Sequence, residues 1–148
     1  MSCILVIRGK KFNVDTFISK SNLRPYSVFY KGQPIFKTKP KGKKSGYNGL
    51  SIDVSKASMD DLKSQINDAI RFLKRNKEKL SHIAKTKTIT SSYLSFGCNQ
   101  RIGRKIAIQS DLFPNTLIKL AGEVGLGIEL VIYSSSLFET DRKNNDSI

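Results

Sequence analysis

The sequence is poor in the residue types that catalytic and metal sites usually need. Among 148 residues it has one histidine, two cysteines and no tryptophan, and its 12 acidic residues stand against 26 lysines and arginines. Acid–base catalysis usually recruits histidine or paired carboxylates, and zinc sites need closely spaced histidine and cysteine ligands. We therefore expect a binding protein that is not an enzyme and that holds no metal or other cofactor.

The histidine and the acids of the longest predicted helix have structural explanations. His82 lies near the end of that helix, where it interacts favourably with the helix dipole. A nucleophilic pair of His82 with Cys3 or Cys98 is the weaker alternative, because no motif links these residues. Capping and the dipole explain the acids in the first half of the helix, which are Asp60, Asp61 and Asp68.

Long hydrophobic runs are missing as well. No apolar stretch reaches the length that crosses a bilayer, and the N-terminus lacks the pattern of a secretory leader. Two cysteines far apart in sequence suit a reducing compartment. These features predict a cytoplasmic protein without a membrane partner, with a single domain over residues 1–133 and a polar, flexible tail over residues 134–148.

Positive charge is the most unusual feature that is present. The formal net charge is +14, and residues 1–56 hold twelve lysines and arginines but only two acids. Such a surface favours acidic proteins or polyanions as partners. The competing explanation is a lysine-rich composition without function, since lysine outnumbers arginine 19 to 7.

The hydrophobic pattern predicts an α+β domain. Strands are expected at residues 3–7, 27–30, 35–37, 50–54 and 128–133, and a hairpin at residues 88–96 and 104–109. Helices are expected at residues 13–21, 58–84 and 114–124. Together they predict a mainly antiparallel sheet with helices on one face, made of a ferredoxin-like βαββαβ core over about residues 48–133 and an N-terminal β-α-β-β extension.

Several short motifs resemble an uncharacterised bacterial family of small α+β domains of unknown function. They are Leu23-Arg24-Pro25, the Lys31-Gly32 turn, Phe113-Pro114, Leu120-Ala121-Gly122 and the run from Gly125 to Leu130 that ends in Ile132-Tyr133. Some members of this family are found beside toxin or defence genes, so the resemblance implies an immunity or inhibitor role. The lysine density of residues 37–44 departs from the family, and a function based on that charge would be peculiar to this chain.

Two basic patches are the candidate binding residues. The first is an exposed, mobile glycine- and proline-containing loop with Lys37, Lys39, Lys41, Lys43, Lys44 and Tyr47. The second lies on the long helix and contains Arg71, Lys74 and Arg75.

The leading hypothesis is a non-catalytic protein-binding domain, an immunity or inhibitor protein that neutralises a bacterial toxin or effector with an acidic surface. The alternative is a nucleic-acid-binding protein that uses the lysine-rich loop 37–47. Lysines in such a loop also keep an exposed hairpin soluble without any ligand. The sequence pattern does not specify an oligomeric state.

Overall fold

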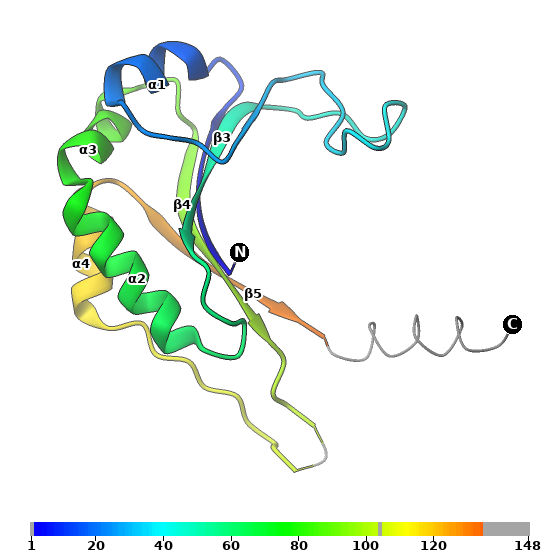
Figure 1. Cartoon of the computed structure of the whole chain (residues 1–148), viewed down its shortest axis with the longest axis vertical. Coiled ribbons are helices and arrows are strands. Elements are labelled where there is room, and N and C mark those ends of the chain that lie inside the picture. Colours follow the sequence, from blue (N-terminus) through cyan, green and yellow to red (C-terminus); the bar gives the residue numbers. More distant parts are fainter. Residues whose placement is uncertain (1, 104, 135–148) are drawn as a thin grey trace, which may run out of the picture.

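The described residues form a five-stranded sheet with four helices against it (Figure 1). A computed structural model describes residues 2–103 and 105–134, and the predicted flexible tail lies outside the described residues except for Ser134. In chain order the elements are β1 (Cys3–Gly9), α1 (Val14–Ser21), β2 (Ser27–Phe29), β3 (Asn48–Ser55), α2 (Leu62–Arg75), α3 (Lys77–Lys85), β4 (Ser91–Asn99), α4 (Asn115–Glu123) and β5 (Gly127–Tyr133).

The strands lie in the order β2-β3-β1-β4-β5. All neighbouring pairs are antiparallel except β4 and β5, which are parallel and are joined through α4. The predicted class, an α+β domain with a mainly antiparallel sheet, is therefore confirmed. Strand β1 lies between β3 and β4, so β3, the α2–α3 segment and β4 form a split βαβ unit with the N-terminal strand in its gap.

One face of the sheet and the helices form the core. Side chains alternate along β1, so that Cys3, Leu5 and Ile7 face the helices and are fully buried. Figure 1 shows all four helices on this side of the sheet. Other members of the core include Leu50, Ile66, Leu73, Leu80, Leu94, Phe96 and Leu117. The opposite face of the sheet carries no helix in the described residues, and we call it the open face.

The predicted strand at residues 104–109 is wrong. In the described part of this segment only an isolated bridge between Gly103 and Ile106 forms, and the chain makes an excursion beyond the end of β4. Both positions beside β4 are already occupied, by β1 on one side and β5 on the other. Ile106 and Ile108 are consequently 47% and 80% exposed.

The predicted long helix over residues 58–84 is two helices. Asn76 ends α2, and its backbone N–H and its side-chain amide both donate to the Phe72 carbonyl oxygen, at 3.0 and 2.9 Å. The first helix also starts later than predicted, because Asp61 caps it by accepting a hydrogen bond from the Ser64 backbone N–H at 3.0 Å. Among the described residues, no helix is long and apolar enough to cross a bilayer.

Candidate binding surface

The predicted lysine loop is a hydrogen-bonded hairpin. Its two arms pair through backbone hydrogen bonds from Gly32 to Ser45, from Ser45 to Gln33 and from Ile35 to Lys43, all between 2.8 and 2.9 Å. The predicted extended piece at residues 35–37 is thus the end of one hairpin arm rather than a strand of the sheet. We call residues 31–46 the lysine hairpin.

The base of the lysine hairpin is fixed to the fold by Asn48. The Asn48 side chain accepts a hydrogen bond from the Lys31 backbone N–H at 2.8 Å and donates one to the Phe12 carbonyl oxygen at 3.0 Å. Nearby, the Tyr30 hydroxyl donates to Asp15 at 2.8 Å, and this bond raises the pKa of Tyr30 above its ordinary value. The hairpin therefore leaves the sheet in a defined direction.

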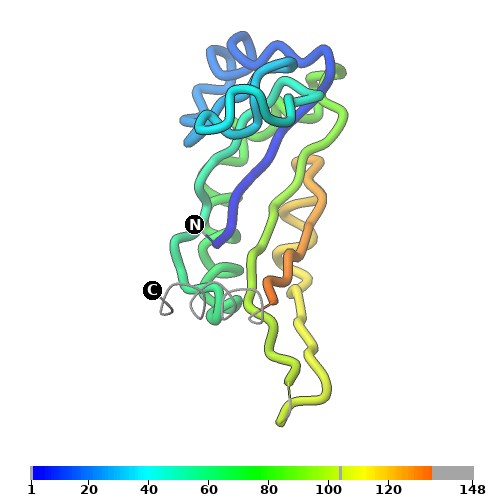
Figure 2. Tube along the Cα trace, turned by 90° about the vertical axis from the view of Figure 1, so that its right-hand side faces the viewer, coloured from blue at the N-terminus to red at the C-terminus, as the bar shows by residue number. Residues whose placement is uncertain are grey.

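The lysine hairpin projects on the side of the open face. In Figure 1 it extends from the end of the sheet away from the helices. Figure 2 looks onto the open face, and the hairpin stands in front of one end of the strands. Lys37, Lys39, Lys41, Lys43 and Lys44 are all exposed, and none has an ion pair with a described residue.

A cationic and aromatic cluster lies where the hairpin joins the open face. The Arg8 guanidinium lies 5.2 Å from the ring centroid of Tyr47 and 5.5 Å from that of Tyr93. Arg8 belongs to β1, Tyr93 to β4, and Tyr47 precedes β3, so three segments meet here. Contacts of this kind hold a guanidinium and two rings in fixed positions at the surface. Of these three residues, only Tyr47 was a predicted binding residue; Arg8 and Tyr93 were not.

A further aromatic ring, that of Phe29, lies against the backbone of Gly49 on the open face. Gly49 of β3 lies opposite Arg8 of β1 on one side and opposite Phe29 of β2 on the other. A Cβ atom at Gly49 would come within 2.4 Å of the Phe29 ring, so the ring occupies the space above the glycine backbone. Glycine at this position therefore allows the ring to lie against the sheet.

Two large apolar side chains are exposed on the lysine hairpin. Ile35 is 50% exposed and Phe36 is 64% exposed, and they directly precede Lys37. Neither residue was among the predicted binding residues, because residues 35–37 were expected to be a short extended piece. Exposed aromatic and aliphatic side chains can serve as anchors at protein interfaces.

The structure separates the second predicted patch from the first. Arg71, Lys74 and Arg75 lie on α2, in the helix layer, whereas the lysine hairpin projects on the other side of the sheet (Figure 1). Arg71 is ion-paired with Asp68, and this arginine and the Ser55 hydroxyl both donate hydrogen bonds to the Asp68 carboxylate. The Ser55 bond, and then the Arg71 bond, lower the pKa of Asp68. Arg71 therefore has a structural partner of a kind that the hairpin lysines lack among the described residues.

The two cysteines are buried and poorly suited to nucleophilic chemistry. Both thiols are free and fully buried. Burial raises the pKa of Cys3 to about 12 and raises that of Cys98, whereas reactive thiols have lowered pKa values. No hydrogen bond in the described residues joins the His82 side chain to either thiol, so the weaker alternative of a cysteine–histidine pair has no geometric support.

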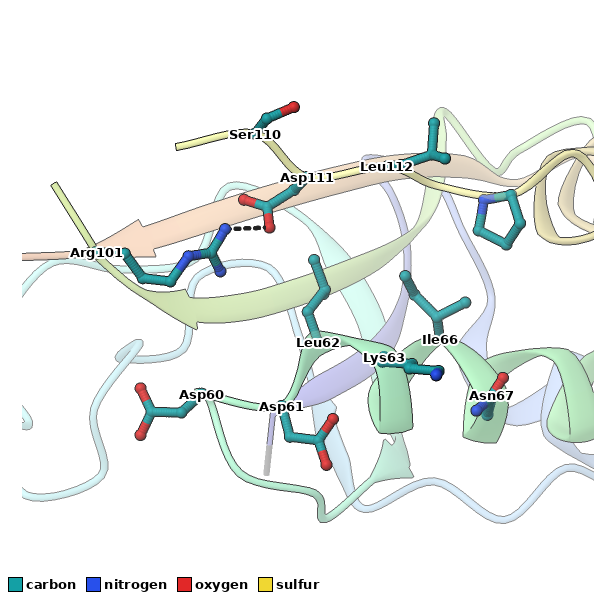
Figure 3. Close-up of a pocket in the computed structure, with 11 residues that line it drawn as sticks. Asp60, Asp61, Leu62, Lys63, Ile66, Asn67, Arg101, Ser110, Asp111 and Leu112 are labelled. Carbon is teal, nitrogen blue, oxygen red and sulfur yellow. Dashed lines mark hydrogen bonds and ion pairs between the residues drawn. The ribbon is translucent and has the colours of Figure 1, made fainter. Parts of the chain in front are cut away.

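A surface hollow of about 480 Å³ lies between the start of α2 and residues 101–114 (Figure 3). Its acids and Arg101 already have partners. Arg101 donates to Asp111 at 2.5 Å, Asp60 accepts from Asn99 at 2.8 Å, and Asp61 caps α2. The bond from Arg101 lowers the pKa of Asp111. Because Asp60, Asp61 and Asp111 already accept hydrogen bonds, the described residues of the hollow present no free acid–base pair to a ligand.

The family model described as "Domain of unknown function (DUF4279)" matches residues 1–135. This match covers all the described residues and confirms the predicted resemblance to an uncharacterised family. No curated protein and no solved structure matches the chain.

Proposed function

The chain belongs to the DUF4279 family of unknown function, and from its surface we propose that it is a non-catalytic domain that binds an acidic protein. The proposed role is that of an immunity or inhibitor protein, which neutralises a toxin or effector by covering it. The observation that carries this proposal is the pair of exposed apolar side chains, Ile35 and Phe36, next to the hairpin lysines. Apolar anchors supply affinity at protein interfaces, while cations around them speed the encounter.

Negative groups on the open face favour a protein over a nucleic acid as the partner. Asp53 on β3 and Glu129 on β5 belong to the set of side chains that point to this face. A phosphate backbone running across the sheet would approach the exposed Glu129 and the half-buried Asp53, whose Oδ1 is inaccessible, whereas a protein can place its own cations or amides there. Anion contacts are therefore confined to the lysine hairpin and the adjacent Arg8 cluster.

Single-stranded nucleic acid is the second candidate, and the Arg8 cluster favours it. Guanidinium and tyrosine rings are stacking surfaces for bases, and lysines on a neighbouring hairpin can follow the phosphates. In that case binding would weaken linearly with salt on a logarithmic plot, with a slope of about 0.7 per phosphate contact.

Pull-down from nuclease-treated lysate, followed by reconstitution with the purified partner, tests the proposal. The informative variant carries Lys41→Gln, Lys43→Gln and Lys44→Gln, and its matched control carries Arg71→Gln, Lys74→Gln and Arg75→Gln on α2. We expect the partner to survive nuclease treatment and to associate about tenfold more slowly with the hairpin variant. The control variant should associate at close to the normal rate.

Two results would reject the protein-binding role. If nuclease treatment releases everything that the chain retains, nucleic acid is the ligand. If both triple variants slow association equally, the hairpin has no special part in recognition and net charge alone explains the binding.

A neutralising role has its own test in living cells. The candidate effector is the product of the gene beside this one, expressed with and without this chain. We expect co-expression to restore growth, and the hairpin variant to restore it less well than the α2 control variant. A protein that binds the chain but is harmless when expressed alone would exclude the immunity role and leave the binding role intact.

A further inference from the structure

Strand β5 forms an unprotected edge of the sheet. It is the last strand in the order, and it pairs only with β4 among the described residues. Edge strands usually carry lysine, proline or a bulge that prevents pairing with another chain. The seven residues of β5 contain no lysine, arginine or proline, although the chain has 26 basic residues in total.

The backbone groups that face outward can be identified from one hydrogen bond. The Tyr133 carbonyl oxygen accepts from the Gln100 N–H at 2.8 Å, so the backbone groups of Tyr133 point toward the β4 side. Since successive residues of a strand alternate, the N–H and C=O groups of Ile128, Leu130 and Ile132 point to the free edge. No turn or loop among the described residues hydrogen-bonds to these groups.

The side chains next to this edge are apolar. Ile128, Leu130 and Ile132 lie on the helix-facing side of β5, opposite Leu94, Phe96 and Cys98 of β4. Ile132 is 51% exposed and Ile118 of α4 is 50% exposed. Between β5 and α4 lies a groove of about 470 Å³ whose lining is apolar apart from backbone. The edge and the groove together form one apolar surface that no other described segment covers.

The sequence of β5 is complementary to itself in the antiparallel direction. With Leu130 opposite its own copy, Ile128 faces Ile132 of the second chain, and all three outward-pointing residues fall in hydrogen-bonded pairs. On the open face Tyr133 falls opposite Gly127, where the missing side chain leaves room for the ring. A shift of register by one residue would lose both the hydrogen-bonded pairs and the placement of Tyr133 opposite Gly127.

Charge on β5 itself does not oppose this pairing. The only charged side chain of β5 is Glu129, and its carboxylate accepts a hydrogen bond from the Ser95 hydroxyl at 2.6 Å, on the β4 side. On α4, Glu123 is ion-paired with Lys77 of α3 at 2.7 Å. The lysine hairpin lies at the far side of the sheet, where it follows the other edge strand, β2.

We propose that two copies of this chain associate through β5, in antiparallel register centred on Leu130, to form one continuous ten-stranded sheet. The occupant of the apolar edge is thus a second copy related by a two-fold axis, the commonest symmetry of homo-oligomers. Both lysine hairpins remain free in this arrangement, so each copy keeps its own binding surface. The dimer does not depend on the proposed protein-binding role.

Sedimentation equilibrium over micromolar to millimolar concentrations tests the association. We expect a dimer that strengthens as salt rises, because salt screens the repulsion between two chains of charge +14. Ile132→Lys should weaken dimerisation at least tenfold. Its control, Ile108→Lys, alters a more exposed isoleucine outside β5 and should leave dimerisation unchanged.

Disulfide trapping tests the register. Leu130→Cys should cross-link two chains rapidly under mild oxidation, since the two-fold axis places this residue beside its own copy. Ile128→Cys should not cross-link to itself, because it faces position 132 of the second chain. The two native cysteines are fully buried and do not compete.

Amide hydrogen exchange on the unmodified chain gives a measurement that needs no variant. The amides of Ile128, Leu130 and Ile132 should exchange more slowly as concentration rises. A chain that remains monomeric up to millimolar concentration, or equal cross-linking at positions 128 and 130, would overturn the proposal.

Discussion

Cations occur in two settings in this molecule, and the two settings differ in their partners. On the helices, Arg71 is paired with Asp68, and Lys77 with Glu123. Lys79 of α3 donates a hydrogen bond to the Asn22 carbonyl oxygen at 3.2 Å. On the lysine hairpin, by contrast, no lysine has an ion pair with a described residue, and the segment itself contains no acid.

This difference separates structural charge from charge that is available to a partner. An ion pair on a helix already has part of its Coulomb interaction satisfied, so a ligand gains less by approaching it. Unpaired lysines on a projecting hairpin keep their full attraction for an acidic surface. The comparison therefore predicts that changes in the helix layer affect folding, whereas changes in the hairpin affect binding.

The largest effect on folding is expected at Gln65 of α2. This side chain is fully buried, and its Nε2 donates to the carbonyl oxygens of Ser58 at 3.0 Å and Gly97 at 2.9 Å. Gln65→Leu removes both bonds and leaves the Gly97 carbonyl oxygen without this donor, whereas the Ser58 carbonyl oxygen keeps its bond from the Asp61 N–H at 3.0 Å. The free energy of unfolding should fall by about 1 to 3 kcal/mol. Urea denaturation measures it, with Asn67→Leu on the exposed side of α2 as the control. A loss below about 0.5 kcal/mol would show that the α2–β4 link is dispensable.

The next effect is on binding and comes from the exposed ring of the hairpin. Phe36→Ala should weaken binding to the protein partner about 30-fold, as expected for an interfacial anchor that contributes about 2 kcal/mol. Because Phe36 is 64% exposed, the free energy of unfolding should hardly change. Ile108→Ala provides the control, since Ile108 is 80% exposed but lies outside the hairpin. Calorimetry that finds equal affinities for the two variants would remove the apolar anchor from the proposed role.

The Asp68 carboxylate gives a smaller, pH-dependent effect on folding. Its pKa is lowered in the folded state by the bonds from Ser55 and Arg71, and the pKa values of Asp61 and Asp111 are lowered by their own hydrogen-bond donors. Their stabilisation is therefore complete above the ordinary carboxyl pKa of about 4 and is lost as pH falls through the folded pKa values.

Asp68→Asn should lower the free energy of unfolding by about 1 kcal/mol at pH 7. It should also reduce the slope of stability against pH between about pH 4 and 2. Denaturation at several pH values measures both quantities. An unchanged slope would mean that other carboxylates account for the acid dependence.

Sequence patterns predicted the elements that depend on local periodicity, and missed those that depend on competition for space. The alternation in β3 and the apolar stripe of α2 identified their buried sides correctly, because each period is a local property. The strand expected at residues 104–109 fails because β1, from the other end of the chain, occupies the position beside β4. No pattern within residues 104–109 carries that information.

Of the candidate surface, the sequence likewise predicted the part that depends on local composition and missed the part that depends on contacts between distant segments. Lysine density identifies an exposed segment from composition alone, and the structure confirms the exposure. The Arg8 cluster, however, joins residues that are 39 and 85 positions from Arg8 in the chain, and only the sheet register brings them together. One signal was available for the exposed Ile35 and Phe36: they follow Pro34, which is unfavourable within a central strand.

The smallest expected effect on folding is that of the hairpin lysines, and it gives the most direct comparison with the cations of the helices. The hairpin variant Lys41→Gln, Lys43→Gln, Lys44→Gln should change the free energy of unfolding by less than about 0.5 kcal/mol, because these side chains are exposed and have no described ion pairs. The α2 variant Arg71→Gln, Lys74→Gln, Arg75→Gln has the same change in charge. It should lose about 1 kcal/mol through the Asp68 pair and the helix dipole. Equal losses of unfolding free energy in thermal denaturation would show that both sets of cations are structural. The hairpin lysines would then not be charges that remain available to a partner.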